Sequence, residues 1–147
     1  MNKRILKKHL RALSCAYTID IIGDYSHIIV RGFKPPPGYN KKQISIRMTV
    51  PKKYPVDVPG LSSNPIHLPT GLLLNGQEPQ DYHPYTGPKG WAWWCFERIE
   101  WDPCRHDLIT IIEVLRATMT DQTQRKIVTK PRAGKEPISW LRKLFFE

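Results

Sequence analysis

The sequence is short of cysteine, of acidic residues and of long apolar runs, and each shortage excludes a class of protein. Its 147 residues contain only three cysteines, Cys15, Cys95 and Cys104, whose spacing is not that of a zinc knuckle. No apolar run approaches the ~20 residues needed to cross a bilayer, and early lysines and arginines interrupt any signal-peptide core. We therefore expect a cytoplasmic protein with reduced thiols and no membrane association.

Familiar catalytic and cofactor-binding motifs are also missing. The chain has no glycine-rich phosphate loop, no Ser-His-Asp order and no paired-carboxylate motif. A metal site would have to combine Cys95, Cys104 and His106, and their C-x8-C-x-H pattern is not a recognised zinc spacing. Adding the more distant His83 does not produce one. The sequence therefore predicts neither a metal nor another cofactor.

The shortage of acidic residues gives the chain a strong positive charge. It has 13 aspartates and glutamates against 23 lysines and arginines, a formal net charge of +10. Such a surplus is typical of proteins that bind nucleic-acid phosphates or acidic proteins. Nucleic-acid binding on a sheet needs aromatics interleaved with cations, whereas the aromatics here cluster with acidic Glu97, Glu100 and Asp102. We therefore expect an acidic protein partner rather than nucleic acid.

The first third of the chain predicts a helix followed by an antiparallel meander. In residues 2–14, leucines recur at helical spacing on one face and cations occupy the other. Residues 19–22 and His27–Phe33 then favour two strands joined by a short turn. In residues 43–50, apolar and polar side chains alternate without a break, which predicts a third strand with one buried face.

Proline dominates the middle of the chain. Eight of the 14 prolines lie in residues 51–88, and each removes an amide donor and disfavours helix in the residue before it. We therefore expect this segment to be extended and looped, with a fourth strand within residues 61–68 or 72–74. The Trp-rich residues 91–94 are interpreted as part of the same loop-like segment.

A second helix is expected within residues 102–119, where apolar residues recur at helical spacing. This places Cys104 at the helix N-terminus, where the helix dipole lowers a thiol pKa. Residues 121–136 are polar and basic, which predicts a linker, and residues 137–147 predict a short amphipathic helix. The chain thus divides into a domain of residues 1–120 and a C-terminal extension of residues 121–147.

Five motifs follow the third predicted strand in a distinctive order. They are a Pro-x-x-Tyr-Pro-x-x-x-Pro run at residues 51–59, a His-Pro pair at His83, then Cys95, a Trp-x-Pro at Trp101, and a helix. This order resembles that of the ubiquitin-conjugating enzymes. The Gly-Tyr pair before the third strand, the paired tryptophans and the Trp-x-Pro-x-x-x-Asp-Leu run are most similar to a bacterial branch. That branch is encoded beside ubiquitin-like modifiers, activating enzymes and deconjugating peptidases.

The resemblance covers roughly residues 1–120 and implies an α+β, UBC-like fold. Such a fold has an N-terminal helix, an antiparallel meander of about four strands, an irregular active-site segment and C-terminal helices. It also implies that one cysteine carries a ubiquitin-like modifier as a thioester and transfers it to an amine on a target protein. A thiolate suits this role because it is both a good nucleophile and a good leaving group. By motif order Cys95 is the expected carrier and Cys104 the alternative, while Cys15 is interpreted as structural.

The resemblance also implies supporting residues and partners. His83, Tyr85 or a backbone amide would polarise the oxyanion of the acyl-transfer intermediate. Asp102 and Asp107 would orient the incoming amine. The basic N-terminal helix would dock a separate activating enzyme, and antiphage defence is the operon context in which such bacterial cassettes occur.

Two features depart from the family pattern. The family's His-Pro-Asn is His83-Pro84-Tyr85 here, so its asparagine is missing. Cys95 follows His83 by 12 residues and precedes Trp101 by 6, where the eukaryotic spacings are about two shorter and two longer. These departures support a second hypothesis, a catalytically inactive binding module of the same fold that presents a modifier or bridges partners.

Overall fold

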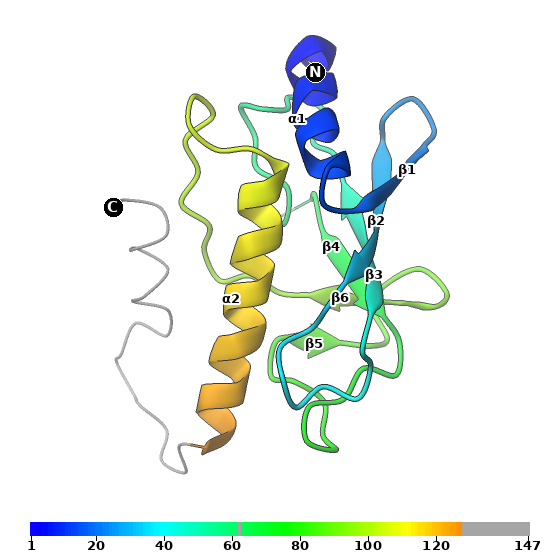
Figure 1. Ribbon diagram of the computed structural model, residues 1–147, viewed down its shortest axis with the longest axis vertical. Coiled ribbons are helices and arrows are strands. Elements are labelled where there is room, and N and C mark those ends of the chain that lie inside the picture. The colour runs from blue at the N-terminus through cyan, green and yellow to red at the C-terminus, as the bar shows by residue number, and fades with distance from the viewer. Residues whose placement is uncertain (62, 128–147) are drawn as a thin grey trace.

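A computed structural model describes residues 1–61 and 63–127 (Figure 1). These residues form an N-terminal helix α1, Lys3–Ser14, a six-stranded sheet, and a second helix α2, Leu108–Ile127. The sheet order is β1-β2-β3-β4-β6-β5, and every neighbouring pair is antiparallel. The strands are β1 Thr18–Ile22, β2 His27–Phe33, β3 Ile44–Thr49, β4 Ile66–Pro69, β5 Tyr82–His83 and β6 Trp91–Trp94. The predicted α+β class and N-terminal helix are confirmed.

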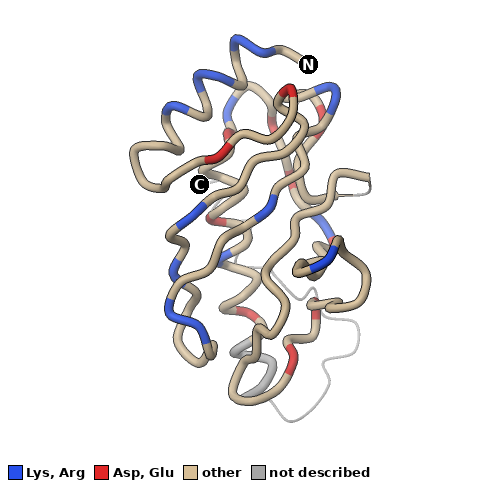
Figure 2. The backbone as a smooth tube through the Cα atoms, turned by 90° about the vertical axis from the view of Figure 1, so that its right-hand side faces the viewer, with Lys and Arg blue, Asp and Glu red and all other residues tan. Residues whose placement is uncertain are grey.

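Helix α1 packs its leucine face against the rest of the molecule. The helix begins after Asn2, whose side chain accepts a hydrogen bond from the Ile5 amide at 3.1 Å, which satisfies one of the free amides of the first turn. Leu6, Leu10 and Leu13 are buried, and each contributes roughly 1.5–3 kcal/mol. All five lysines and arginines of α1 are exposed, and Figure 2 marks their positions along the helix.

The core lies between the sheet and the two helices, which cover one sheet face (Figure 1). In β3 the predicted alternation is confirmed, because Ile44, Ile46 and Met48 are buried while the intervening residues are partly exposed. Strand β4 overlaps the first of the two ranges expected for a fourth strand. No helix among the described residues is both long and apolar enough to cross a membrane.

The expectation of about four strands and a loop-like Trp-rich segment is wrong. Residues Trp91–Trp94 form β6, which pairs with both β4 and β5. The alternation of apolar and polar residues that usually marks a strand is absent here, because all four residues are apolar. Their burial does alternate: Ala92 and Trp94 are buried, and Trp91 and Trp93 are partly exposed. Strand β5 has only two residues and is too short to show periodicity.

The predicted bounds of the second helix also need correction. The helix begins at Leu108, so Cys104 lies in the preceding turn and not at the helix N-terminus. It continues to Ile127, so the predicted linker is wrong for residues 121–127. Polar composition misled here, because Gln122 is buried and its side-chain oxygen accepts the Gln80 amide at 2.7 Å. The helix expected in residues 137–147 lies outside the described residues.

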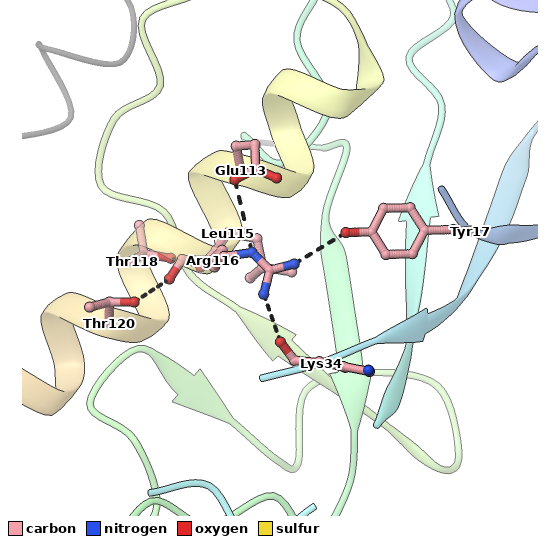
Figure 3. A network of polar contacts seen from close by, with 7 residues as sticks. All are labelled: Tyr17, Lys34, Glu113, Leu115, Arg116, Thr118 and Thr120. Carbon is pink, nitrogen blue, oxygen red and sulfur yellow. Dashed lines mark hydrogen bonds and ion pairs between the residues drawn. The ribbon is translucent and has the colours of Figure 1, made fainter. Parts of the chain in front are cut away.

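Arg116 ties the middle of α2 to the sheet (Figure 3). Its guanidinium donates to the Lys34 carbonyl at 2.7 Å and to the Tyr17 hydroxyl at 3.1 Å, and lies 4.4 Å from the centre of the Phe33 ring. Glu113 forms only a longer contact, at 3.9 Å, on the exposed side. The guanidinium therefore joins α2 to the residue before β1 and to the residue after β2.

Arg116→Ala should lower the free energy of unfolding by about 1.5–3 kcal/mol, because two charge-assisted hydrogen bonds are lost. Glu113→Ala is the matched control. It removes only an exposed ion pair and should change stability by less than about 0.5 kcal/mol. Urea unfolding followed by circular dichroism measures both variants. Equal losses of stability in the two variants would show that the ion pair with Glu113, and not the two hydrogen bonds, accounts for the effect of Arg116.

Candidate functional site at the β5–β6 hairpin

The segment that carries most of the predicted site residues is a hairpin. Tyr82 of β5 pairs with Trp94 of β6, and His83 pairs with Trp93. Tyr82 and Trp94 are buried, while His83 and Trp93 are partly exposed and bring their ring centres to 5.0 Å at an interplanar angle of 31°. The register thus places a histidine and a tryptophan side by side on the sheet face opposite the core.

The loop between the two strands folds back over that face. His67 of β4 lies opposite Trp93 in the register and is nevertheless buried. Gly87 of the loop covers it so closely that an added Cβ would lie 2.9 Å from the His67 ring and 2.6 Å from the Trp91 carbonyl oxygen. The Thr86 hydroxyl donates to the His83 carbonyl at 2.9 Å. These contacts fix the loop against the sheet and hold its position relative to Trp93.

Cys95 follows β6 directly and is a free, partly buried thiol. Its backbone amide donates to the Asp81 carbonyl at 2.8 Å. That amide is therefore not available to stabilise the oxyanion of an acyl group carried on the Cys95 thiol. Burial raises the pKa of the Cys95 thiol, and the nearby charges of Asp81 and Glu97 raise it further. The neutral thiol is therefore favoured at neutral pH. When the thiolate does form, it is a strong nucleophile and a poor leaving group.

The structure separates the other predicted members of the site. The Tyr85 side chain is 96% exposed at the hairpin loop, so it lies in solvent rather than over a thiol. The His83 ring stacks on Trp93, and among the described residues no hydrogen bond involves its imidazole. Asp81, which the sequence did not single out, lies beside Cys95, and its carboxylate accepts a hydrogen bond from the Gln122 side chain of α2.

Asp102 organises the turn before α2. Its carboxylate accepts the Cys104 amide at 3.0 Å, and its own amide donates to Nδ1 of His106 at 2.9 Å. Asp107 caps α2, since its carboxylate accepts the Thr110 amide at 3.1 Å. Cys104 itself is exposed. Both aspartates therefore have local structural roles, and no described contact joins either of them to Cys95.

Sequence reasoning missed a partly buried cluster where α1 meets the Pro-rich corner and the turn before α2. The Tyr54 hydroxyl lies 2.6 Å from Nδ1 of His9, and Trp101 donates from its indole nitrogen to the Pro55 carbonyl at 2.7 Å. Burial, and then the negative charge of Asp107, raise the pKa of Tyr54. The Tyr-Pro and Trp-x-Pro motifs were the signal, because they mark the two segments that meet here.

Two histidines of this region predict sensitivity to acid. Burial is the largest cause that lowers the pKa of both His9 and His106 below the ordinary 6.5, although Asp107 opposes the shift at each. A lowered pKa means that the fold prefers the neutral ring. The contribution of each neutral ring to stability is therefore complete above pH 6.5 and is lost as the pH falls through the folded-state pKa. Protonation at Nδ1 of His106 also removes the acceptor for the Asp102 amide.

Unfolding by urea at a series of pH values should therefore show stability falling below pH 6.5. Proton NMR of the histidine rings should give titrations below the ordinary value for both residues. The control variant His9→Gln/His106→Gln should lose stability less steeply with falling pH. A stability that stays constant between pH 7 and pH 5, or that rises, would contradict the prediction.

Among the described residues, no group of three or more histidine, cysteine or acidic side chains is arranged to hold a metal ion. Comparison with protein-family models, with curated proteins and with solved structures finds no match to this chain. The functional interpretation therefore rests on the motif order and on the geometry of the hairpin.

Proposed function

We propose that this protein is a non-catalytic, UBC-fold binding module for a ubiquitin-like modifier. The observation that carries the proposal is the identity of residue 93. The two spacing departures point to the same position, because residue 93 lies 10 residues after His83 and 8 before Trp101. A tryptophan stands where the family pattern calls for a thiol, and it pairs with His83 across the hairpin. An indole cannot carry an acyl group.

Three features of the hairpin support binding rather than acyl transfer. Trp93 is partly exposed and held by its stack on His83, and a rigid aromatic is a good anchor for a protein partner. The Cys95 thiol has a raised pKa, and its own amide is already bonded. The family's asparagine is absent, and Tyr85 in its place lies in solvent.

Acyl transfer through Cys95 is the second candidate function, and the free, partly exposed thiol at the end of β6 favours it. In this case the Cys95 thiolate attacks the thioester carbonyl of the modifier on an activating enzyme, and that enzyme's thiolate leaves. A target amine then attacks the new thioester, the Cys95 thiolate leaves, and the amine gives up a proton to solvent. Asp81 and Glu97 beside the thiol would attract the ammonium form of the amine.

Both candidate functions imply the same cellular compartment and the same docking partner. The thiols of Cys15, Cys95 and Cys104 are unpaired, which fits a reducing compartment such as the cytoplasm. The cations of α1 suit an acidic docking surface on an activating enzyme. Antiphage defence is the setting that the bacterial resemblance implies.

One pair of measurements tests the proposal. The protein is mixed with the ubiquitin-like modifier, its activating enzyme and ATP, and the products are run on non-reducing gels. We expect no reductant-sensitive adduct. Isothermal titration with the modifier alone should still show binding, and Trp93→Ala should weaken it at least about tenfold, as expected for an interfacial anchor. Trp91→Ala, a partly exposed neighbour on the same strand, is the matched control.

Three outcomes would overturn the binding module. The first is an adduct that dithiothreitol removes and that Cys95→Ser abolishes while Cys104→Ser does not, which would establish the second candidate. The second is a failure of the wild-type protein to bind the modifier in the titration. An adduct that depends on Cys104 instead would contradict both candidates.

A further inference from the structure

Strand β1 forms one edge of the sheet, and no other described strand lies along its outer side. Among the described strands it pairs only with β2, in a regular register from Thr18 opposite Arg31 to Ile22 opposite His27. Within residues 1–61 and 63–127, no backbone hydrogen bond from another segment reaches this strand. Alternate amides and carbonyls of an edge strand point away from its neighbour. The outer side of β1 therefore offers a row of unused donors and acceptors.

The strand lacks the devices that usually protect such an edge. Its sequence, Thr-Ile-Asp-Ile-Ile, contains no proline, lysine or arginine, and four of its five residues are β-branched. Its one charge, on Asp20, is neutralised by Arg31 at 2.5 Å. Ile21 and Ile22 are 47% and 43% exposed, and consecutive residues of a strand face opposite sides. Apolar surface thus lies on both faces beside the open edge.

Cations border the edge along α1, which packs beside β1 (Figure 2). Lys3 and Lys7 both lie 5.8 Å from the centre of the Tyr25 ring in the turn that follows β1. Arg11 continues their stripe at the same helical spacing. Asp24 of the turn is already paired with Lys3 at 2.9 Å. Lys7 and Arg11 have no ion-pair partner among the described residues, so this border is positively charged.

We propose that the β1 edge binds an extended, acidic segment of a partner protein by strand addition. The partner's main chain pairs with the outer amides and carbonyls of β1, and its acidic side chains face Lys7 and Arg11. Alternate apolar side chains of the partner then lie on the opposite face of the sheet, against Ile22, because Ile21 pairs with core residue Ile28 and faces the α1 side. Main-chain pairing supplies the affinity in this mode of recognition, and the side chains select the partner. A second copy of this chain fits poorly, because pairing two β1 edges would bring two cationic helices together.

The test uses a short blocked peptide of alternating valine and glutamate as the probe. Two-dimensional amide NMR of the full-length protein follows the resonances of Thr18–Ile22 during titration, and hydrogen exchange follows their protection. We expect shifts and slowed exchange confined to β1 and to α1. A peptide with lysine in place of glutamate should bind at least tenfold more weakly, and the same peptide N-methylated at alternate residues should not bind.

A pair of protein variants separates charge at the edge from overall charge. Lys7→Glu removes a cation beside β1 on an exposed helix position, and should weaken binding of the acidic peptide severalfold. Lys42→Glu makes the same change in the connection between β2 and β3, at the end of the molecule away from α1 (Figure 1), and should leave binding unchanged.

Three results would overturn the proposal. Equal binding of the N-methylated peptide would show that the main chain is not used. Absence of shifts in β1 at millimolar peptide would show that the edge does not accept a strand. Sedimentation of a dimer by the protein alone, with β1 amides protected without peptide, would show that a second copy covers the edge.

Discussion

Trp94→Ala should lower the free energy of unfolding by about 3–5 kcal/mol, the range for truncating a large buried aromatic. Trp94 is fully buried between β6 and α2, and its indole nitrogen donates to the Thr118 hydroxyl at 3.0 Å. The truncation leaves a cavity at the point where the hairpin meets the helix. For a domain whose total stability is on the order of 5–15 kcal/mol, this loss is a large fraction.

Two control variants separate the causes of this loss. Trp94→Phe keeps most of the apolar volume and removes the indole hydrogen bond, so it should cost less than the alanine substitution. Trp93→Ala, next in the chain but partly exposed, should cost much less than Trp94→Ala because no sealed cavity forms. Guanidinium unfolding followed by far-ultraviolet circular dichroism measures all three. Equal costs at positions 93 and 94 would contradict the observed facing of β6.

Tyr54→Ala should also lower the free energy of unfolding by about 3–5 kcal/mol. Tyr54 is 1% exposed, and its hydroxyl lies 2.6 Å from Nδ1 of His9 on α1. Its ring lies 6.3 Å from that of Trp101, centre to centre. The truncation therefore removes the contacts through which α1 packs against the segment that precedes α2.

Tyr54→Phe is the control for the hydroxyl alone. It keeps the packing and removes one hydrogen bond, so the expected loss is only about 0.5–1.5 kcal/mol. The His9 ring should also titrate at a different pH in this variant, which NMR detects. If Tyr54→Phe were as destabilising as Tyr54→Ala, the hydrogen bond of the hydroxyl, and not the packing of the ring, would account for the stability that Tyr54 contributes.

The parts of the fold that could be predicted are those in which a single period dominates. Helix α1 and strand β3 follow from the spacing of leucines and from strict alternation, because each has one buried face and one exposed face. Strand β6 could not be found in this way, since Ala92 and Trp94 face the core while apolar Trp93 lies on the other side. The end of α2 was hidden because buried Gln122 is polar, and only tertiary hydrogen bonds explain its burial.

For the candidate site, the sequence singles out segments but not their geometry. Motif order singled out His83 and the Trp-rich segment, and the structure makes them partners in one hairpin. Sequence alone could not show that Trp93, and not Cys95, stacks on His83, because that depends on strand register. Nor could it show that Asp102 is used in a turn, since hydrogen bonding to nearby amides is a local property of the folded chain.

The order of the strands has a consequence for how many partners the protein can hold at once. Strand β1 is the first strand of the sheet and β6 the fifth, so four interstrand steps of about 4.8 Å place the two roughly 19 Å apart. A strand added at β1 also extends the sheet away from the hairpin. Under the two proposals, a modifier at Trp93 and a strand added at β1 would use separate sites on one sheet, and holding both would raise the effective concentration of each for the other.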